Sequence, residues 1–253
     1  MKTNQQITRR QALIAGLSSV GGLVLSGCSQ KLPPTYGNIL RMGDNFTYAV
    51  HRALLPGQSL VKEYSQDDIS SFPAIGTTNP GDPNNPDSSE IYRQLQAGGF
   101  TQWRLSIEGL VTRPGTFSLA DLKRFPSRTQ ITRHTCEEGW SAIGEWTGVP
   151  LSRVLDEVGL LPTARFVKFS SYDDWADDSI DMLDALHPQT LLAYGMNGRE
   201  LSIPHGGPVR LRVETQMGYR SMKYLQRIVV MDEFDDGGPK GSIQSGWSWY
   251  AGI

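Results

Sequence analysis

The two cysteines limit how this chain can be held together. Cys28 ends the run Leu25-Ser26-Gly27-Cys28 behind an apolar segment, whereas Cys136 lies in the middle of the 253 residues. The first position is typical of the end of a bacterial lipoprotein signal, so the mature protein would keep one thiol without a disulfide partner. The fold must then depend on a hydrophobic core, for which this length suffices in one generous domain. A formal charge of -2 with 38% hydrophobic residues disfavours both a disordered chain and a nucleic-acid surface.

The first 40 residues have the pattern of an export signal followed by a tether. Arg9 and Arg10 precede an apolar stretch over 12–25 that is too short and too rich in Gly and Ser for a membrane span. We therefore predict a twin-arginine lipoprotein signal over 1–28, a tether over 29–40 and a single domain over 41–253. Such a protein is expected in the periplasm, attached to a membrane through lipid on Cys28. An ordinary signal peptide with a chance cysteine is the alternative, and the choice between inner and outer membrane stays open.

Short alternating segments with turns between them dominate the rest of the chain. Alternation predicts strands over 103–108 and 165–170, and further strands are predicted over 129–134, 208–213 and 224–231. Asn197-Gly198 predicts a hairpin turn. Helices are expected behind Ser118, ending near Phe125, and over 151–160. The Asp-, Asn- and Pro-rich segment 65–90 is interpreted as a long irregular surface excursion. This pattern favours an α+β domain with β-rich mixed sheets and a few helices.

Cys136 has unusual neighbours for an inert core residue. It is followed by Glu137, Glu138, a glycine and a tryptophan. A thiolate is a soft ligand for redox metals, but one thiolate cannot make a zinc or iron–sulfur site. It fits best where an organic cofactor supplies the remaining sulfur ligands. The alternative is that Cys136 is an ordinary small residue of the hydrophobic core.

Two later segments carry a resemblance to a known family. These are residues 191–210, which contain Ile203-Pro204-His205-Gly206-Gly207-Pro208, and the run Gly218-Tyr219-Arg220-Ser221-Met222-Lys223-Tyr224. With the cysteine segment, residues 100–231 resemble the molybdopterin domain of the sulfite oxidase family. The stretch after the cysteine is more similar to the periplasmic methionine-sulfoxide-reductase catalytic branch than to true sulfite oxidases. The resemblance implies that family's fold and a molybdenum–molybdopterin cofactor.

The resemblance also implies a set of cofactor contacts. Cationic side chains suit an anionic cofactor, and glycines let the backbone approach it. The segment 43–48 resembles the family's N-terminal pterin-contacting loop, and Ser171 matches a hydroxyl position that touches the cofactor. The expected cofactor-binding residues are Asn45, Tyr48, Cys136, Ser171, His205, Arg210, Gly218, Arg220 and Lys223.

Within that resemblance, Cys136 is the expected molybdenum ligand in a reaction that transfers one oxygen atom to or from a small molecule. Glu138 is the candidate proton relay, with Glu137 as the alternative, and Trp175 lies where the family usually brings a tyrosine. Because Glu137 and Glu138 would repel sulfite, we favour reduction of a sulfoxide-like substrate over sulfite oxidation.

Electrons would come from a separate haem protein or cytochrome, because the chain has no Cys-x-x-Cys-His haem attachment. Two rival functions remain open. One is a cysteine hydrolase with Cys136 as nucleophile and His205 as base. The other is a ligand-binding lipoprotein without catalysis.

Overall fold

The computed structural model describes residues 39–253 except 56, 58, 174–176, 239–240 and 244. The predicted signal over 1–28, residues 29–38 of the predicted tether, and Trp175 lie outside the described residues. Helix α2, Ile39–Leu54, begins inside the stretch expected to be tether. No helix among the described residues is both long and apolar enough to cross a membrane.

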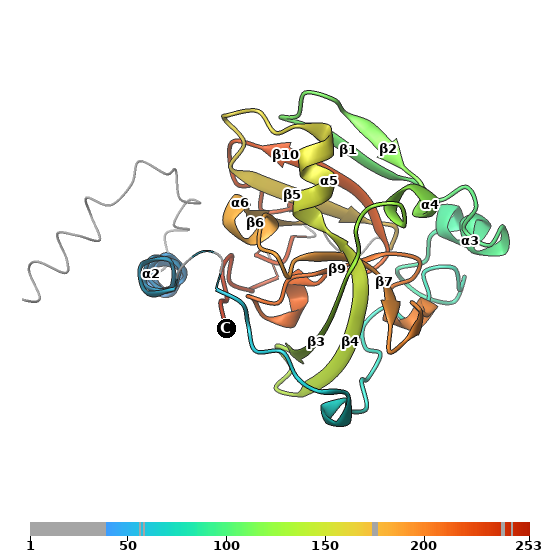
Figure 1. Cartoon of the computed structure of the whole chain (residues 1–253), viewed down its shortest axis with the longest axis horizontal. Helices are drawn as coiled ribbons and strands as arrows, with labels where there is room; N and C mark the ends of the chain where they lie inside the picture. The colour runs from blue at the N-terminus through green and yellow to red at the C-terminus, as the bar shows by residue number, and fades with distance from the viewer. Residues whose placement is uncertain (1–38, 56, 58, 174–176, 239–240, 244) are drawn as a thin grey trace, which may run out of the picture. The chain divides into compact units, whose positions relative to one another are not determined.

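Two β-sheets, one mixed and one antiparallel, form the body of the described chain (Figure 1). The first has the order β2-β1-β10-β5-β6, in which β1 and β10 are parallel and the other pairs antiparallel. The second has the antiparallel order β3-β4-β7-β8, with β9 also paired to β7. The strands are β1 Leu105–Gly109, β2 Gly115–Phe117, β3 Arg128–Thr135, β4 Ser141–Pro150, β5 Phe166–Ser171, β6 Asp177–Asp181, β7 Leu191–Met196, β8 Arg199–Glu200, β9 Arg210–Arg212 and β10 Leu225–Met231. The predicted α+β class is confirmed, and each of the five predicted strands overlaps an observed one.

Among the described residues, the helices are few and mostly short. They are α2, α3 Glu90–Ala97, α4 Leu119–Leu122, α5 Leu151–Val158 and α6 Met182–Ala185, with 3-10 turns η1 Gln66–Asp68, η2 Ile203–His205 and η3 Gly218–Arg220. The capping box expected at Ser118 is present: Asp121 N donates to Ser118 Oγ at 3.1 Å, and Ser118 N donates to the Asp121 carboxylate at 2.9 Å. Helix α4 ends at Leu122, three residues before the predicted end. Helix α2 was not predicted.

The Asn197-Gly198 turn joins β7 to β8 as the sequence predicts. Both residues have positive φ, 49° and 72°, which is the backbone of the type I′ turn that suits twisted antiparallel strands.

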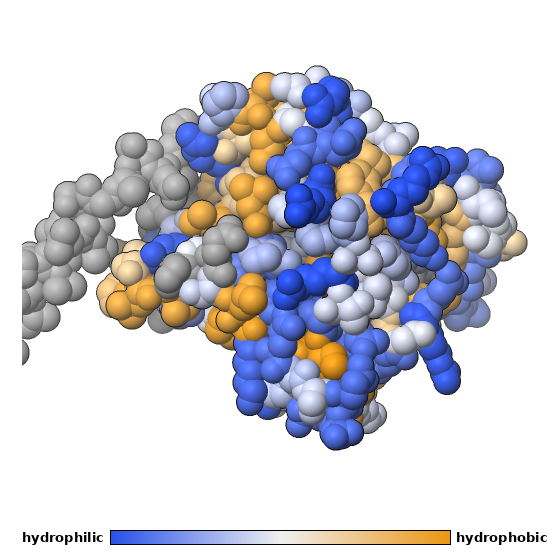
Figure 2. Space-filling view, in the orientation of Figure 1, coloured by the Kyte–Doolittle hydropathy of each residue, from blue (hydrophilic) through white to orange (hydrophobic). Residues whose placement is uncertain are grey.

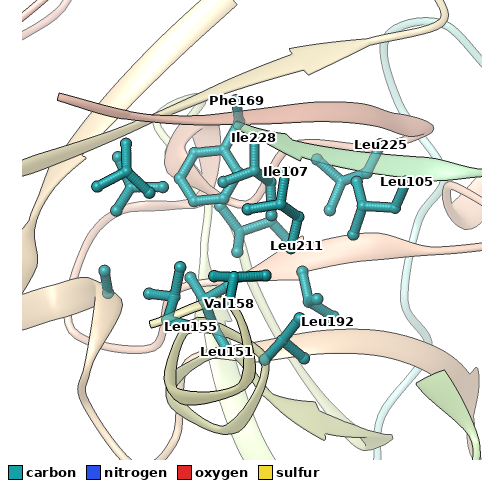
Figure 3. Close-up of a cluster of buried hydrophobic side chains, with 14 of the residues drawn as sticks. Leu105, Ile107, Leu151, Leu155, Val158, Phe169, Leu192, Leu211, Leu225 and Ile228 are labelled. Atoms are coloured by element: carbon teal, nitrogen blue, oxygen red, sulfur yellow. The ribbon is translucent and has the colours of Figure 1, made fainter. Parts of the chain in front are cut away.

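The main core lies between the first sheet and the layer made by α5, β7 and β9 (Figure 3). Helix α5 turns Leu151, Val154, Leu155 and Val158 inward from one face, as the predicted periodicity requires. Leu192 and Leu211 join them, and the first sheet contributes the facing residues Leu105, Ile107, Phe169, Leu225 and Ile228. Burial of this apolar surface is the main force that holds both sheets together.

Leu155→Ala tests the importance of this core. Leu155 is fully buried, so truncation leaves a cavity and should lower the free energy of unfolding by about 2–5 kcal/mol. Leu183→Ala is the matched control, because Leu183 is 41% exposed and its loss should cost less than about 1 kcal/mol. Urea titration monitored by circular dichroism measures both, and equal destabilisation by the two variants would contradict this view of the core.

Candidate functional site

A cavity of about 540 Å³ gathers side chains from six separate parts of the chain. The residues expected from sequence that line it are Cys136, Glu138, Ser171, His205, Arg210, Gly218 and Lys223. The remaining wall comes from segment 72–77, from His134, Glu137 and Trp140 around the β3–β4 turn, from Asp173 and Asp178, from Pro204 and residues near η3, and from Ser242, Ser245 and Trp247. The structure therefore brings together most of the predicted site residues, although they span nearly 90 positions of sequence.

Cys136 sits in the turn between β3 and β4, with only 2% of its surface exposed. The turn is closed by Cys136 N donating to Trp140 O at 2.9 Å. Burial raises the pKa of the Cys136 thiol to about 11; the backbone N–H of Glu138 opposes this rise and the Glu137 carboxylate adds to it. At neutral pH the thiol is therefore protonated and a poor nucleophile, and a bound metal ion would be needed to displace its proton.

Both ring nitrogens of His205 are already engaged. Because the Phe72 carbonyl only accepts, His205 Nε2 donates to it at 3.1 Å, and Nδ1 accepts from the Ser202 hydroxyl at 2.9 Å. Burial lowers the pKa of His205, which favours this neutral form. The structure gives His205 the role of holding the cavity wall, and this arrangement disfavours the hydrolase hypothesis in which it activates Cys136.

The deep wall of the cavity carries positive charge. Arg210 is buried and donates to His205 O at 3.0 Å and to Ser221 O at 2.6 Å. Lys223 Nζ donates to Ile75 O at 2.9 Å, to Pro204 O at 3.2 Å and to Thr77 O. No carboxylate among the described residues lies within salt-bridge distance of either cation.

The pKa shifts of Arg210 and Lys223 reflect the free energy needed to bury these two cations. Burial and the Arg212 charge lower the pKa of Arg210. Burial and the Arg210 charge lower the pKa of Lys223 to about 8, and the charge of the Asp173 carboxylate opposes this shift only in part. Buried cations without a carboxylate partner are stabilised by an anionic ligand. The cavity is thus suited to a negatively charged molecule beside a soft thiolate ligand.

Comparison with known proteins identifies the class of such a molecule. Residues 94–238 match the family model for the oxidoreductase molybdopterin-binding domain. The chain belongs to this family, which is the sulfite oxidase-type group of molybdopterin oxidoreductases.

Named relatives agree with this assignment. A candidate protein-methionine-sulfoxide reductase subunit, YedZ1, of Azospira oryzae is 33% identical over 98% of this chain and 89% of its own length. The protein-methionine-sulfoxide reductase catalytic subunit MsrP of Ralstonia nicotianae is 35% identical over 52% of this chain and 44% of its own length. In three dimensions, the sulfane dehydrogenase SoxCD of Paracoccus pantotrophus matches with a TM-score of 0.52 and 28% identity, over 54% of this chain and 40% of that one.

The residues of the cavity fit molybdopterin. The thiol of Cys136 is the soft ligand, and Arg210 and Lys223 supply positive charge for an anionic cofactor. Gly218 also lines the cavity, and only glycine fits there because a Cβ would lie 2.4 Å from His134 Nε2. Among the described residues, no group of three or more His, Cys, Asp or Glu side chains is placed to bind a metal.

Three residues expected to bind the cofactor do not line the cavity. Arg220 is buried and pairs with Asp178, and it also donates to Ser248 O at 2.7 Å and Trp249 O at 2.6 Å. It therefore ties β6 to the C-terminal segment behind the cavity wall.

Asn45 and Tyr48 lie on α2, where the sequence resemblance implied a loop. Asn45 Oδ1 accepts from Trp249 Nε1 at 2.7 Å, and the Tyr48 ring packs 4.9 Å from Trp249 and 5.1 Å from Tyr250. The structure thus gives them a packing role, which anchors the helix on the C-terminal aromatic residues.

The segment 72–77 is the part of the cavity wall that the sequence analysis missed. It was included in the surface excursion 65–90, but His205, Lys223 and Tyr224 donate to the carbonyls of Phe72, Ile75 and Thr77. The segment is irregular as predicted, but over these six residues it forms part of the cavity wall, and Thr77 is buried. The available signal was Phe72-Pro73-Ala74-Ile75-Gly76, an apolar run within a polar stretch.

The remaining candidates are held in place by neighbours. Glu138 is exposed, and its carboxylate accepts from Trp140 Nε1 at 3.1 Å. Ser171 Oγ donates to Asp173 O at 2.9 Å, and burial raises the pKa of the Asp173 carboxyl to about 6.

Sulfate binding to cofactor-free protein tests the charge of the deep wall. Lys223 is charged below its pKa of about 8 and loses its charge above it, so sulfate affinity should fall as the pH rises from 7 to 9. Lys223→Met should weaken binding at pH 7 about tenfold and flatten this dependence. Isothermal titration measures both, with the exposed Lys62→Met as control. Unchanged sulfate binding by Lys223→Met would contradict the proposed role of this charge.

Proposed function

We propose that this molybdopterin oxidoreductase is an exported enzyme that reduces a sulfoxide, of which methionine sulfoxide is the leading candidate. The observation that carries the proposal is the charge pattern around Cys136. Arg210 and Lys223 line the cavity, whereas the Glu137 and Glu138 carboxylates adjoin the thiol. Of the other carboxyls in the lining, Asp178 is paired with Arg220, and burial raises the pKa of Asp173 to about 6. The names of the Azospira and Ralstonia relatives point to the same reaction class.

The reaction needs two electrons and two protons for each sulfoxide reduced to a sulfide and water. Molybdopterin supplies two-electron oxygen-atom transfer when it is bound. Cys136 would hold the metal, while Arg210 and Lys223 hold the cofactor's negative charge by their own charges. Glu138, oriented by Trp140, is placed at the exposed side of the cavity to pass protons from water.

The cavity lining also favours a neutral sulfur compound over sulfite. Phe72 and Trp140 lie in contact with ring centroids 6.0 Å apart, and Trp247 lines the same cavity. Aromatic rings contact the apolar substituents of a neutral sulfur compound, and the Glu137 and Glu138 carboxylates repel a sulfite dianion. Sulfite oxidation is therefore the less favoured alternative.

Cys136→Ala and Glu138→Gln separate metal binding from proton transfer. Cys136→Ala should abolish molybdenum retention, measured by mass spectrometry of the metal. Glu138→Gln should keep the metal but lower kcat/KM for methionine sulfoxide about 100-fold with a dye electron donor. Glu200→Gln is the control, because Glu200 is exposed and pairs only with Lys123 among the described residues. Sulfite oxidation faster than sulfoxide reduction would overturn the proposed direction and substrate.

For location, we infer twin-arginine export and lipid attachment at Cys28, with electrons supplied by a separate haem protein. Helix α2 supports attachment to a lipid surface. Its inner face holds Tyr48 and Arg52 against the body, with Arg52 paired to Asp181 at 3.0 Å. Its outer face exposes Met42 (58%) and Phe46 (61%).

Apolar surface is visible in Figure 2 where α2 lies in Figure 1. The ten residues 29–38 reach at most about 35 Å, so lipid on Cys28 would keep this helix close to the bilayer. An exposed apolar helix face near a membrane is expected to bind its surface.

Vesicle flotation tests this inference on protein expressed without lipid, from residue 29 onward. The unlipidated protein should bind phospholipid vesicles weakly, and Phe46→Ser should reduce the bound fraction several-fold, because about 1.5–3 kcal/mol of apolar burial is lost. Ile91→Ser is the matched control, since Ile91 is 58% exposed on α3. Equal loss of binding in both variants would argue against α2 as the membrane-facing helix, and unprocessed Cys28 in cells would contradict the anchor.

A further inference from the structure

His134 lies beside the expected metal ligand but has no part in the function proposed so far. It lies near the end of β3, and Cys136 follows two residues later in the turn to β4. Both residues line the cavity, and His134 is 8% exposed.

The ring of His134 is held in one tautomer by Arg212. Arg212 Nη1 lies 2.7 Å from His134 Nδ1. A guanidinium can only donate, so Nδ1 must accept. The ring proton of the neutral imidazole therefore sits on Nε2.

Arg212 itself cannot turn away. Its guanidinium makes two hydrogen bonds to Glu214, at 3.0 and 2.8 Å, and both side chains are 1% exposed. It also stacks over the Trp146 ring at 4.4 Å, and Gln130 Nε2 donates to Glu214 Oε1 at 3.2 Å. The buried ion pair thus fixes the donor that selects the tautomer.

The opposite edge of the ring faces the cavity. A Cβ on Gly218 would lie 2.4 Å from Nε2, so the absence of a side chain there leaves the space beside this nitrogen open. The centroids of the Phe72 and Trp140 rings are 5.2 and 5.5 Å from that of the His134 ring. Among the residues that the structure describes, Arg212 is the one hydrogen-bond partner of this imidazole. The Nε2–H is therefore presented to whatever occupies the cavity.

We propose that His134 is a fixed, neutral hydrogen-bond donor to molybdopterin, acting through Nε2–H and positioned by the Arg212–Glu214 pair. The acceptor is an electronegative atom of the cofactor, because the surrounding Arg210 and Lys223 charges draw an anionic molecule to this wall. This inference rests on the cofactor of the family and does not depend on which substrate is reduced.

The tautomer is tested first, by nitrogen NMR of protein labelled at its four histidines. The His134→Gln spectrum assigns the His134 resonances. We expect a protonated Nε2 and an unprotonated, hydrogen-bonded Nδ1. A proton on Nδ1 would overturn the proposal, whatever the enzyme's activity.

Cofactor retention is tested second, with two variants of opposite hydrogen-bonding capacity. His134→Phe keeps a ring but removes the donor, and it should speed molybdopterin loss about tenfold and shift the Mo(V) electron paramagnetic resonance spectrum. His134→Gln keeps an N–H donor and should restore most of the retention. Arg133→Gln is the control, since Arg133 is the exposed neighbour on the same strand.

Thermal unfolding of the cofactor-free variants confirms that each is folded. Wild-type retention and an unchanged Mo(V) spectrum in folded His134→Phe would overturn the proposal. The proposed sulfoxide reduction would be unaffected by that result. Conversely, wild-type protein that contains molybdopterin but fails to reduce sulfoxides would contradict the proposed function and leave the role of His134 unaffected.

Discussion

The buried ion pair between Arg212 and Glu214 is the interaction on which the site depends. Taking two charges out of water costs several kcal/mol each, and removing one partner alone typically destabilises a protein by about 3–5 kcal/mol. The pair is accommodated because Trp146, Gln130 and His134 satisfy its remaining faces. These contacts link β9 to β3 and β4, so the strand that presents Cys136 is aligned with the strand that begins at Arg210. A hydrophobic substitute of similar volume would hold the strands together but would not orient His134.

Charge is separated along the depth of the cavity. Arg210 and Lys223 lie at the deep wall, where burial raises the cost of leaving them without an anion, and Glu138 lies at the exposed side. Inside a low-dielectric site such charges act over several ångströms, so one wall retains an anionic cofactor while the other discriminates among substrates. The raised pKa of Cys136 belongs to the same pattern, because its burial next to Glu137 favours the protonated thiol until a metal replaces the proton.

Sequence patterns predicted the local structure better than the roles of individual side chains. Alternation located the strands, and the Ser118 capping box and the Asn197-Gly198 turn appear as expected, because these signals depend on neighbours within a few residues. His134 was missed because its partner Arg212 is 78 positions away and only strand pairing brings them together. Helix α2 was missed because its inner face is stabilised by contacts with Asp181 and Trp249, which lie 129 and 205 positions further along the chain than their partners on the helix. Tertiary contacts of this kind override local propensity.

The cationic residues implied by the family resemblance show that a residue can match a family motif and still use its hydrogen bonds on the protein's own backbone. The cavity wall is made largely of loops, whose buried carbonyls have no sheet or helix to satisfy them. Lys223 donates to three such carbonyls, and Arg220 and His205 also direct donors at backbone oxygens. Their hydrogen bonds therefore shape the cavity, while the charge of Lys223 still acts on an anion within it. His134 makes one hydrogen bond among the described residues, and its second ring nitrogen borders the cavity. It is therefore better placed for a direct bond than several residues that a family motif nominates.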